Sequence, residues 1–251
     1  MTETLHVVSA GFSHLKGTSH QPRHLVELTD KGVIGDRELC LVDPVQKRVL
    51  RTVQNPALLK VITEVADNRL TVAFPDGKSY TTPLVETGEV IVCDYWGRNE
   101  SVHPIAGQLS EIFTYYLGRP VLLARAERNV VYGRPLTIIG TASLKELGQR
   151  LGAENFEQQY ARFRASLVVE TSEPFIEETW QGCSFDLTAK RGILAQDNYS
   201  VNIANPVPRC AVIDYNPATG EKDARILKTL ASFRPLNDKG EPCFGVFASL
   251  R

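Results

Sequence analysis

The chain has 251 residues, enough for one large domain or two of ordinary size. Hydrophobic residues make up 43% and charged residues 23%, which predicts a packed core and excludes a disordered chain. The formal net charge is -1, from 28 basic and 29 acidic residues, so no overall field attracts nucleic acid or an anionic membrane. We therefore expect neither nucleic acid nor a membrane as a partner.

Cysteine usage and the N-terminus bear on the compartment. The five cysteines are odd in number, widely spaced and without a CxxC pair, which argues against a disulfide framework and a zinc or iron–sulfur site. Free thiols suit a reducing compartment. No signal peptide and no apolar stretch of membrane-spanning length is visible. The expected location is the cytoplasm.

The first hundred residues have the pattern of short strands separated by turns. Their spacing indicates a small barrel or a curled sheet. The expected strands are Leu5–Ala10, His24–Thr29, Glu38–Val42, Arg48–Val53, Leu70–Phe74, Ser79–Thr82 and Glu89–Trp96.

Helical periodicity follows. One helix is expected over Gly107–Leu117, ended by Gly118, and a second over Thr141–Leu151, capped by Thr141 or Ser143. Further strands are expected at Ser166–Glu170, Cys183–Thr188 and Cys210–Asp214. The fold class is thus mixed and β-rich (α+β), with a domain boundary near residues 120–130.

Cys210 is the most informative residue. It follows Arg209 between a proline-marked turn and an apolar run. An adjacent cation favours the thiolate, which attacks sulfur or binds a soft metal. The alternative is a buried core cysteine, the usual role of a free cysteine and the one we assign to the other four.

Three further basic residues are candidate anion contacts. Arg164 precedes a strand, where arginine suits bidentate recognition of phosphate or carboxylate, although a solvated pair with Arg162 is the more common arrangement. Lys16 lies in a polar loop beside glycine, a weak signal for an anion site. Arg37 is expected in a tight turn, paired structurally with Asp36.

Several enzyme classes lack their motifs. His20 and His24 have HxxxH spacing but Pro22 lies between them, and no HExxH occurs, so a zinc hydrolase is unsupported. No GxSxG, P-loop or GxGxxG element occurs, which lowers the hydrolase, nucleotidase and Rossmann hypotheses.

Taken together, the motifs resemble the MOSC superfamily, in particular its two-part members such as the mitochondrial amidoxime-reducing component and its bacterial counterparts. The similarity covers nearly the whole chain, and its most specific part is Pro208–Asp214. The other matching segments are Glu27–Arg37, Thr52–Leu58, Ala142–Leu144, Phe163–Arg164, Trp180, Pro217–Gly220, Leu227–Leu230 and Phe233–Arg234.

The resemblance implies a MOSC N-terminal β-barrel-like domain over residues 1–122 and a MOSC β-barrel domain with peripheral helices over 123–251. It implies the molybdenum cofactor, a molybdopterin, as ligand. By position, Cys210 becomes the metal ligand or sulfur carrier. Lys16, Arg37, Arg164 and Arg209 become cofactor contacts, in keeping with an anionic pterin dithiolene that carries a phosphate.

Some positions depart from the family pattern. Gly17 stands where a serine is usual, Arg134 replaces the serine of a Ser-Pro pair, and Phe163-Arg164 is followed by Ala165-Ser166 instead of Pro-Asn. Thr52-Val53-Gln54 lacks the arginine of a Thr-Gln-Arg run. These substitutions affect the cofactor site more than the fold.

Three functions follow from the resemblance. The first is a molybdenum oxidoreductase that reduces small N-hydroxylated substrates with electrons from an external electron-transfer protein. The second is a sulfur carrier or sulfurtransferase with a Cys210 persulfide supplied by a cysteine desulfurase. The third is a non-catalytic binding module, since a fold does not fix a function.

Overall fold

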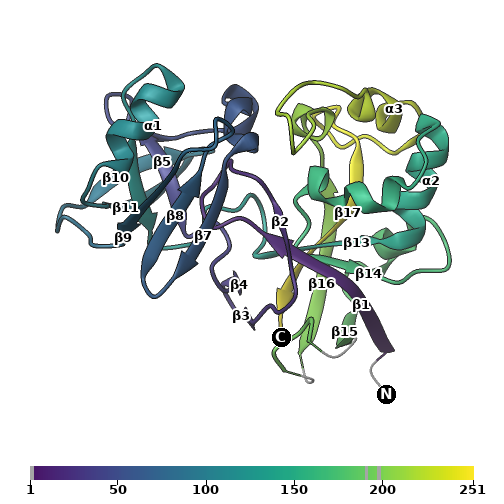
Figure 1. The fold of residues 1–251 in the computed structure, drawn as a ribbon. Coiled ribbons are helices and arrows are strands. Elements are labelled where there is room, and N and C mark those ends of the chain that lie inside the picture. The colour runs from purple at the N-terminus through teal and green to yellow at the C-terminus, as the bar shows by residue number, and fades with distance from the viewer. Residues whose placement is uncertain (1–2, 190–191, 197–198) are drawn as a thin grey trace.

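The computed structural model describes residues 3–189, 192–196 and 199–251. It has two lobes, each built around strands that close on themselves (Figure 1). The predicted β-rich α+β class is confirmed. The predicted small barrel in the first hundred residues is also present, completed by one strand from beyond them.

The first barrel closes in the order β10-β11-β12-β5-β6. A three-stranded sheet, β7-β8-β9, packs on it and shares its apolar core, and helix α1 covers the same core. The elements are β5 (Leu39–Asp43), β6 (Arg48–Val49), β7 (Ile62–Ala66), β8 (Arg69–Ala73), β9 (Ser79–Pro83), β10 (Ile91–Tyr95), β11 (Arg98–Pro104), α1 (Leu109–Leu117) and β12 (Leu122–Ala126).

The second sheet has the order β14-β13-β17-β16-β15-β1-β2, and a further pairing of β1 with β14 closes it into a barrel. Its strands are β1 (Glu3–Phe12), β2 (Gln21–Arg23), β13 (Leu136–Gly140), β14 (Leu167–Val169), β15 (Ser184–Ala189), β16 (Ser200–Pro208) and β17 (Cys243–Leu250). A short hairpin, β3 (Leu28–Thr29) with β4 (Gly32–Val33), adds buried residues to the same core.

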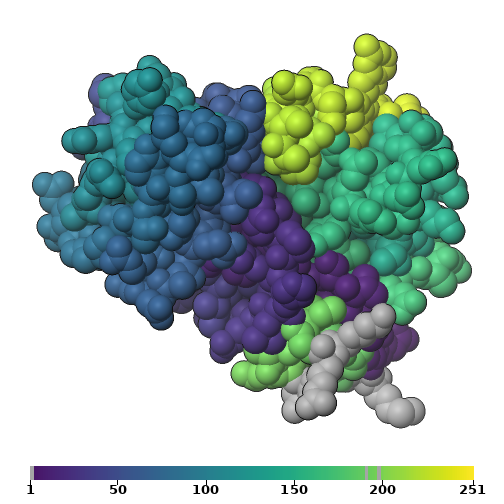
Figure 2. All heavy atoms as spheres, viewed as in Figure 1, coloured from purple at the N-terminus to yellow at the C-terminus, as the bar shows by residue number. Residues whose placement is uncertain are grey.

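The N-terminal strand belongs to the barrel formed mainly by the second half of the chain. β1 runs parallel to β15 and antiparallel to β14, and places Leu5, Val7 and Phe12 in that barrel's core. In Figure 1 the purple β1 crosses into the lobe of green and yellow strands, and Figure 2 shows the purple segment wedged between the lobes. The division into residues 1–122 and 123–251 stays a prediction.

The remaining helices cover one side of the second barrel. A core cluster that includes Leu144, Phe163, Ile213 and Leu230 joins them to the sheet. These helices are α2 (Thr141–Leu151), α3 (Ile226–Phe233) and the 3₁₀ helices η3 (Phe156–Phe163), η4 (Ile176–Trp180) and η5 (Ala211–Asp214); η1 (Thr52–Gln54) and η2 (Pro56–Lys60) lie in the first lobe.

Both predicted α-helices form, and Gly118 ends α1 in the left-handed region with φ 65°. The predicted cap of α2 is wrong. Gly140 occupies the N-cap, and the Ser143 hydroxyl instead donates to buried Glu177. The Ser143 hydroxyl is engaged there because a buried carboxylate requires hydrogen-bond donors from the protein, and Glu177 also accepts from the Gly140 N–H.

Three expected strands differ from the structure. Only Leu28–Thr29 of the 24–29 segment is a strand, and Arg48–Val53 divides into β6 and the start of η1. Ala211–Asp214 is not a strand but the single 3₁₀ turn η5. A short apolar run does not distinguish a strand from a buried helical turn, because both bury their side chains.

Candidate functional site

A pocket of about 180 Å³ lies between the two lobes. The first lobe contributes the loop after β1, residues 51–53 and the turn between β10 and β11. The other side is formed by the end of η3, the end of β16 with the start of η5, and part of β17. Lys16, Arg37, Arg164, Arg209 and Cys210 all line it. The structure thus brings the five predicted site residues together, while their roles in binding stay predictions.

Lys16 is half-buried in the pocket wall, and its ammonium lies 5.0 Å from the centroid of the Tyr95 ring. Among the described residues no carboxylate pairs with it. Burial, followed by the charges of Arg37 and Arg164, lowers the pKa of Lys16 to about 7. An anionic ligand here would supply the missing counter-charge.

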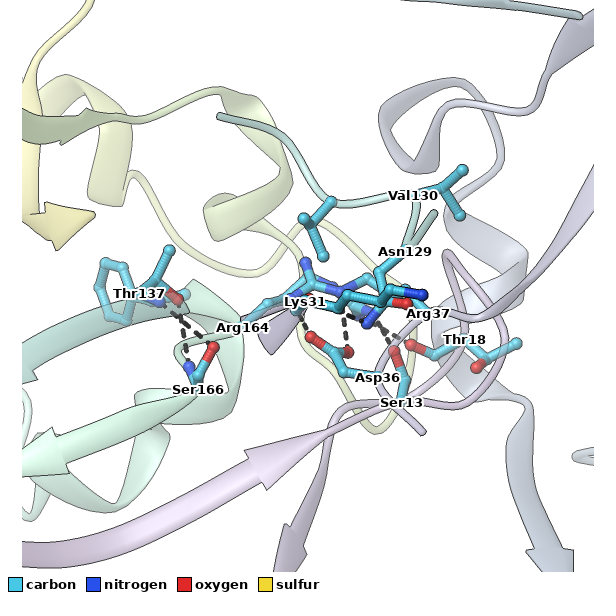
Figure 3. Close-up of polar contacts among 12 residues, drawn as sticks. Ser13, Thr18, Lys31, Asp36, Arg37, Asn129, Val130, Thr137, Arg164 and Ser166 are labelled. Atoms are coloured by element: carbon cyan, nitrogen blue, oxygen red, sulfur yellow. Dashed lines mark hydrogen bonds and ion pairs between the residues drawn. The ribbon is translucent and has the colours of Figure 1, made fainter. Parts of the chain in front are cut away.

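Arg164 is held in place by neutral acceptors. It donates to the Thr18 carbonyl at 2.7 Å and the Ser13 hydroxyl at 2.5 Å, as Figure 3 shows. Burial, followed by the charge of Arg37, lowers the pKa of Arg164 to about 10, so it remains a cation at neutral pH. Three of its five N–H groups have no partner among the described residues.

Arg37 makes the predicted pair with Asp36, through two hydrogen bonds of 2.8 and 2.5 Å (Figure 3). Burial by itself lowers the pKa of Arg37, but the charge and hydrogen bonds of Asp36 outweigh it and the net shift is upward. Arg37 therefore contributes less free positive charge to the pocket than Lys16 or Arg164.

The Arg209 side chain donates its hydrogen bonds to backbone carbonyls. Its guanidinium donates to the carbonyls of Phe244 and Phe163, which ties the end of β16 to β17 and η3. Burial lowers the pKa of Arg209 to about 10. Although Arg209 precedes Cys210, its guanidinium makes no hydrogen bond to the sulfur among the described residues, because it donates to buried carbonyl groups.

Cys210 is exposed and occupies the N-cap position of η5. Its main-chain carbonyl accepts a hydrogen bond from Ile213. The core role predicted for the other cysteines holds for Cys40 and Cys93, whereas Cys183 is exposed and Cys243 half-buried. Exposure alone does not single out Cys210. Of the five cysteines, it is the one that lines this pocket.

The expected solvated pair of Arg162 and Arg164 is wrong. Arg162 is buried and makes a two-fold ion pair with Asp223 at 2.8 and 2.9 Å. Strand geometry does not begin until Leu167, since Arg164 follows η3 in a left-handed conformation with φ 52°. The two arginines therefore share the pocket but have different partners.

Sequence reasoning missed an aromatic corner of the pocket. Arg51 stacks on the Trp96 ring at 4.0 Å, and Tyr132 contacts Trp96 edge to face. Trp96 comes from the turn between β10 and β11, and Tyr132 from the connection that leads to β13. The sequence offered one signal for this corner. Trp96 and Tyr132 are large aromatic residues that each precede a glycine, Gly97 and Gly133, and a large aromatic side chain exposed to water in a turn is energetically unfavourable.

The pocket is strongly cationic. Lys16 and five arginines line it, and Glu241 is the acidic side chain among its lining residues. Asp36 and Asp223 neutralise two of the arginines from behind. A site of this charge favours an anion that carries several oxygens.

The described residues contain neither a cluster of potential metal ligands nor a membrane-spanning helix. Within 3–189, 192–196 and 199–251, no group of three or more His, Cys, Asp or Glu is placed to hold a metal ion. None of the helices in these ranges combines the length and the apolar character that a transmembrane span requires.

Comparisons with known proteins place the chain in a family. It is 26% identical over 239 residues to a molybdenum cofactor sulfurase of Caenorhabditis elegans, covering 93% of this chain and 32% of that protein. For the Caenorhabditis briggsae molybdenum cofactor sulfurase the values are 27%, 93% and 32%. The chain thus spans about a third of the length of these relatives.

A solution structure of a Bordetella bronchiseptica protein matches 40% of this chain and 85% of its own, with 12% identity and a TM-score of 0.31. The family model of the MOSC domain matches residues 121–251, more than half of the chain. The resemblance seen in the motifs is confirmed, and the chain belongs to the MOSC domain family.

Proposed function

We propose that the pocket between the barrels binds the molybdenum cofactor and that Cys210 is the protein ligand of its metal. The observation that carries the proposal is the joint placement of an exposed cysteine with Lys16 and Arg164, two cations without carboxylate partners among the described residues. A molybdopterin carries a phosphate and sulfur donors of its own, so it needs cations and a single protein thiolate. The residues present fit that requirement.

Each side chain has a distinct task in this proposal. Arg164, fixed by Ser13 and Thr18, presents its remaining N–H groups to an anion. Lys16 gains a full charge when an anion raises its lowered pKa. Arg209 holds the chain before Cys210 rigid through its bonds to Phe244 and Phe163, and Arg37 is oriented by Asp36. Such pre-ordering limits the entropy lost on binding.

The activity that we propose is the reduction of small N-hydroxylated substrates. An N–OH group takes up electrons and protons and releases water, with the electrons delivered by a separate electron-transfer protein. When bound, the cofactor supplies the redox chemistry. The protein supplies the position of the metal, through Cys210, and a cationic entrance.

The test is the cofactor content of protein made in a host that synthesises the cofactor. We expect molybdenum by elemental analysis and a pterin by fluorescence after oxidation, in comparable amounts. Cys210→Ser should lose molybdenum, and Lys16→Gln should lose both by about tenfold or more. Lys31→Gln, at an exposed lysine that does not line the pocket, is the matched control. Wild-type protein without molybdenum or pterin would reject the proposal.

Sulfur transfer is the second candidate. Its support is the exposure of Cys210, together with the similarity of the chain to molybdenum cofactor sulfurases. Incubation with a cysteine desulfurase and cysteine, followed by mass spectrometry, should then show one added sulfur on Cys210. Cys183 is also exposed but does not line the pocket, so Cys183→Ser is the control. Equal labelling of wild type and Cys210→Ser counts against this function.

A non-catalytic binding module is the third candidate. It predicts that Cys210→Ala complements a deletion strain as well as wild type does, and a clear loss of function in that assay argues against it.

A further inference from the structure

Beyond the cofactor contacts, the mouth of the pocket contains a cation that the proposed function does not use. Arg51 lies flat over Trp96, with its guanidinium carbon 4.0 Å from the ring centroid. No hydrogen bond or ion pair among the described residues involves the Arg51 guanidinium, and residues 51–53 line the pocket. A guanidinium stacked on a ring keeps its N–H edge free, and that edge matches the two oxygens of a carboxylate.

Next to this cation lies an aromatic surface. Trp96 and Tyr132 line the pocket with 48% and 45% of their surface exposed, and their ring centroids are 5.6 Å apart. Tyr132 in turn lies 6.4 Å from the buried ring of Phe247, which also lines the pocket. Exposed large aromatic side chains grouped at a pocket mouth are typical of ligand contact, because leaving them in water is unfavourable.

The backbone also exposes Trp96 in an unusual way. Trp96 has a φ of 57° in the two-residue turn that joins β10 to β11, where Tyr95 pairs with Arg98. Small polar residues and glycine normally occupy such positions, and a bulky side chain there is rare. In this turn Trp96 is one of the residues that line the pocket.

We propose that Arg51, Trp96 and Tyr132 form a subsite for a planar aromatic carboxylate. The carboxylate is received in the plane of the Arg51 guanidinium, and the ring of the ligand packs against Trp96 and Tyr132. The subsite thus narrows the proposed substrates of this pocket to N-hydroxylated compounds that also carry an aromatic carboxylate. The role of the subsite in substrate recognition rests on the proposed function. Binding of an aromatic carboxylate to it can be measured without any turnover of a substrate.

The experiment uses the full chain and 2-naphthoate as the probe. Calorimetry measures its affinity beside two analogues, the saturated decahydro-2-naphthoate, which lacks the aromatic faces, and 2-naphthamide, which lacks the charge. Both should bind at least about tenfold more weakly than 2-naphthoate. Equal binding of the saturated acid, or no binding of 2-naphthoate to wild type, overturns the proposal.

Variants locate the binding. Arg51→Gln and Trp96→Leu should each weaken 2-naphthoate by about tenfold. Arg150 stacks on Phe233 at the same 4.0 Å outside the pocket, so Arg150→Gln is the matched control and should bind as wild type does. In ¹⁵N spectra the indole signal of Trp96 should shift on titration, while that of Trp180, packed on Phe185, stays in place. An unmoved Trp96 signal contradicts the subsite.

Cofactor analysis of the same samples separates this proposal from the previous one. Arg51→Gln that keeps its molybdenum and pterin but loses 2-naphthoate supports the subsite. Loss of cofactor from Arg51→Gln assigns Arg51 to the cofactor site and overturns the subsite alone. Binding of 2-naphthoate by wild-type protein that never acquires cofactor upholds the subsite and rejects the proposed function.

Discussion

Lys16 and Arg164 illustrate how the chemistry of the site depends on individual side chains. Both are cations drawn into a wall of the pocket, and both have their pKa lowered first by burial. Arg164 stays charged because an arginine begins from so high a pKa. Lys16, with a pKa of about 7, changes charge near neutrality. The ligand affinity of the pocket is therefore expected to depend on pH through Lys16.

The burial of Lys16 also predicts a pH-dependent stability. Its pKa is about 7 in the folded chain against an ordinary 10.5, so between these values the unfolded chain binds more protons, and stability rises with pH. Lys16→Met should be more stable than wild type by on the order of 3 kcal/mol at pH 7. The advantage should shrink toward pH 10. Urea denaturation at several pH values measures it.

The exposed Lys31 provides the control for that experiment. Lys31→Met makes the same replacement at an exposed position and so measures the effect of exchanging a surface lysine for methionine at each pH. If the stability difference between Lys16→Met and wild type follows that of Lys31→Met at every pH, Lys16 keeps an ordinary pKa in the folded chain.

At the scale of elements, η5 and β17 together position Cys210. η5 begins at the residue after Cys210 and buries Ile213, while β17 supplies the Phe244 carbonyl that holds Arg209. Close packing of β17 on β13 depends on Gly245, which has φ 70°. A Cβ at this residue would lie 2.6 Å from the Ile138 carbonyl oxygen and 2.8 Å from Ile139.

We therefore expect Gly245→Ala to be more destabilising than Gly240→Ala. Gly240 has a similar φ of 75° but no atom within 4 Å of its Cβ position, so Gly240→Ala introduces backbone strain without a steric clash. The steric clash should add about 1–3 kcal/mol at Gly245. Denaturant titration of both variants measures their free energies of unfolding. Equal losses of stability would show that β17 can shift to accommodate the added methyl group without further destabilisation.

At the scale of the whole molecule, the two lobes are not consecutive in sequence. β1 lies between β14 and β15 in the second barrel, and the chain then passes through the first lobe before it returns. The match to the MOSC family model begins at residue 121. It therefore does not include β1, although β1 is a strand of the second barrel. The N-terminal segment thus both completes one barrel and carries Lys16 into the pocket.

This arrangement predicts that residues 123–251 do not fold by themselves. Without β1 the barrel loses Leu5, Val7 and Phe12 from its core and leaves the edges of β14 and β15 unpaired. The isolated fragment should show no cooperative thermal transition in near-UV circular dichroism. Fusion of residues 1–35 through a flexible linker should restore one. A cooperative transition in the fragment alone would contradict the structural role of β1.

The sequence by itself determined the β-rich class, the helices α1 and α2, the barrel of the first lobe and the family, because periodicity, turn residues and the Pro208–Asp214 motif are local signals. It did not predict α3. Only the tertiary structure decided that β1 joins the second barrel. The folded structure likewise decided that Arg162 donates hydrogen bonds to Asp223 and that Arg209 donates its own to backbone carbonyls. It also decided that Arg51 and Trp96 reach the pocket. Pairing between distant segments and competition for buried donors depend on the folded arrangement, and no local pattern encodes them.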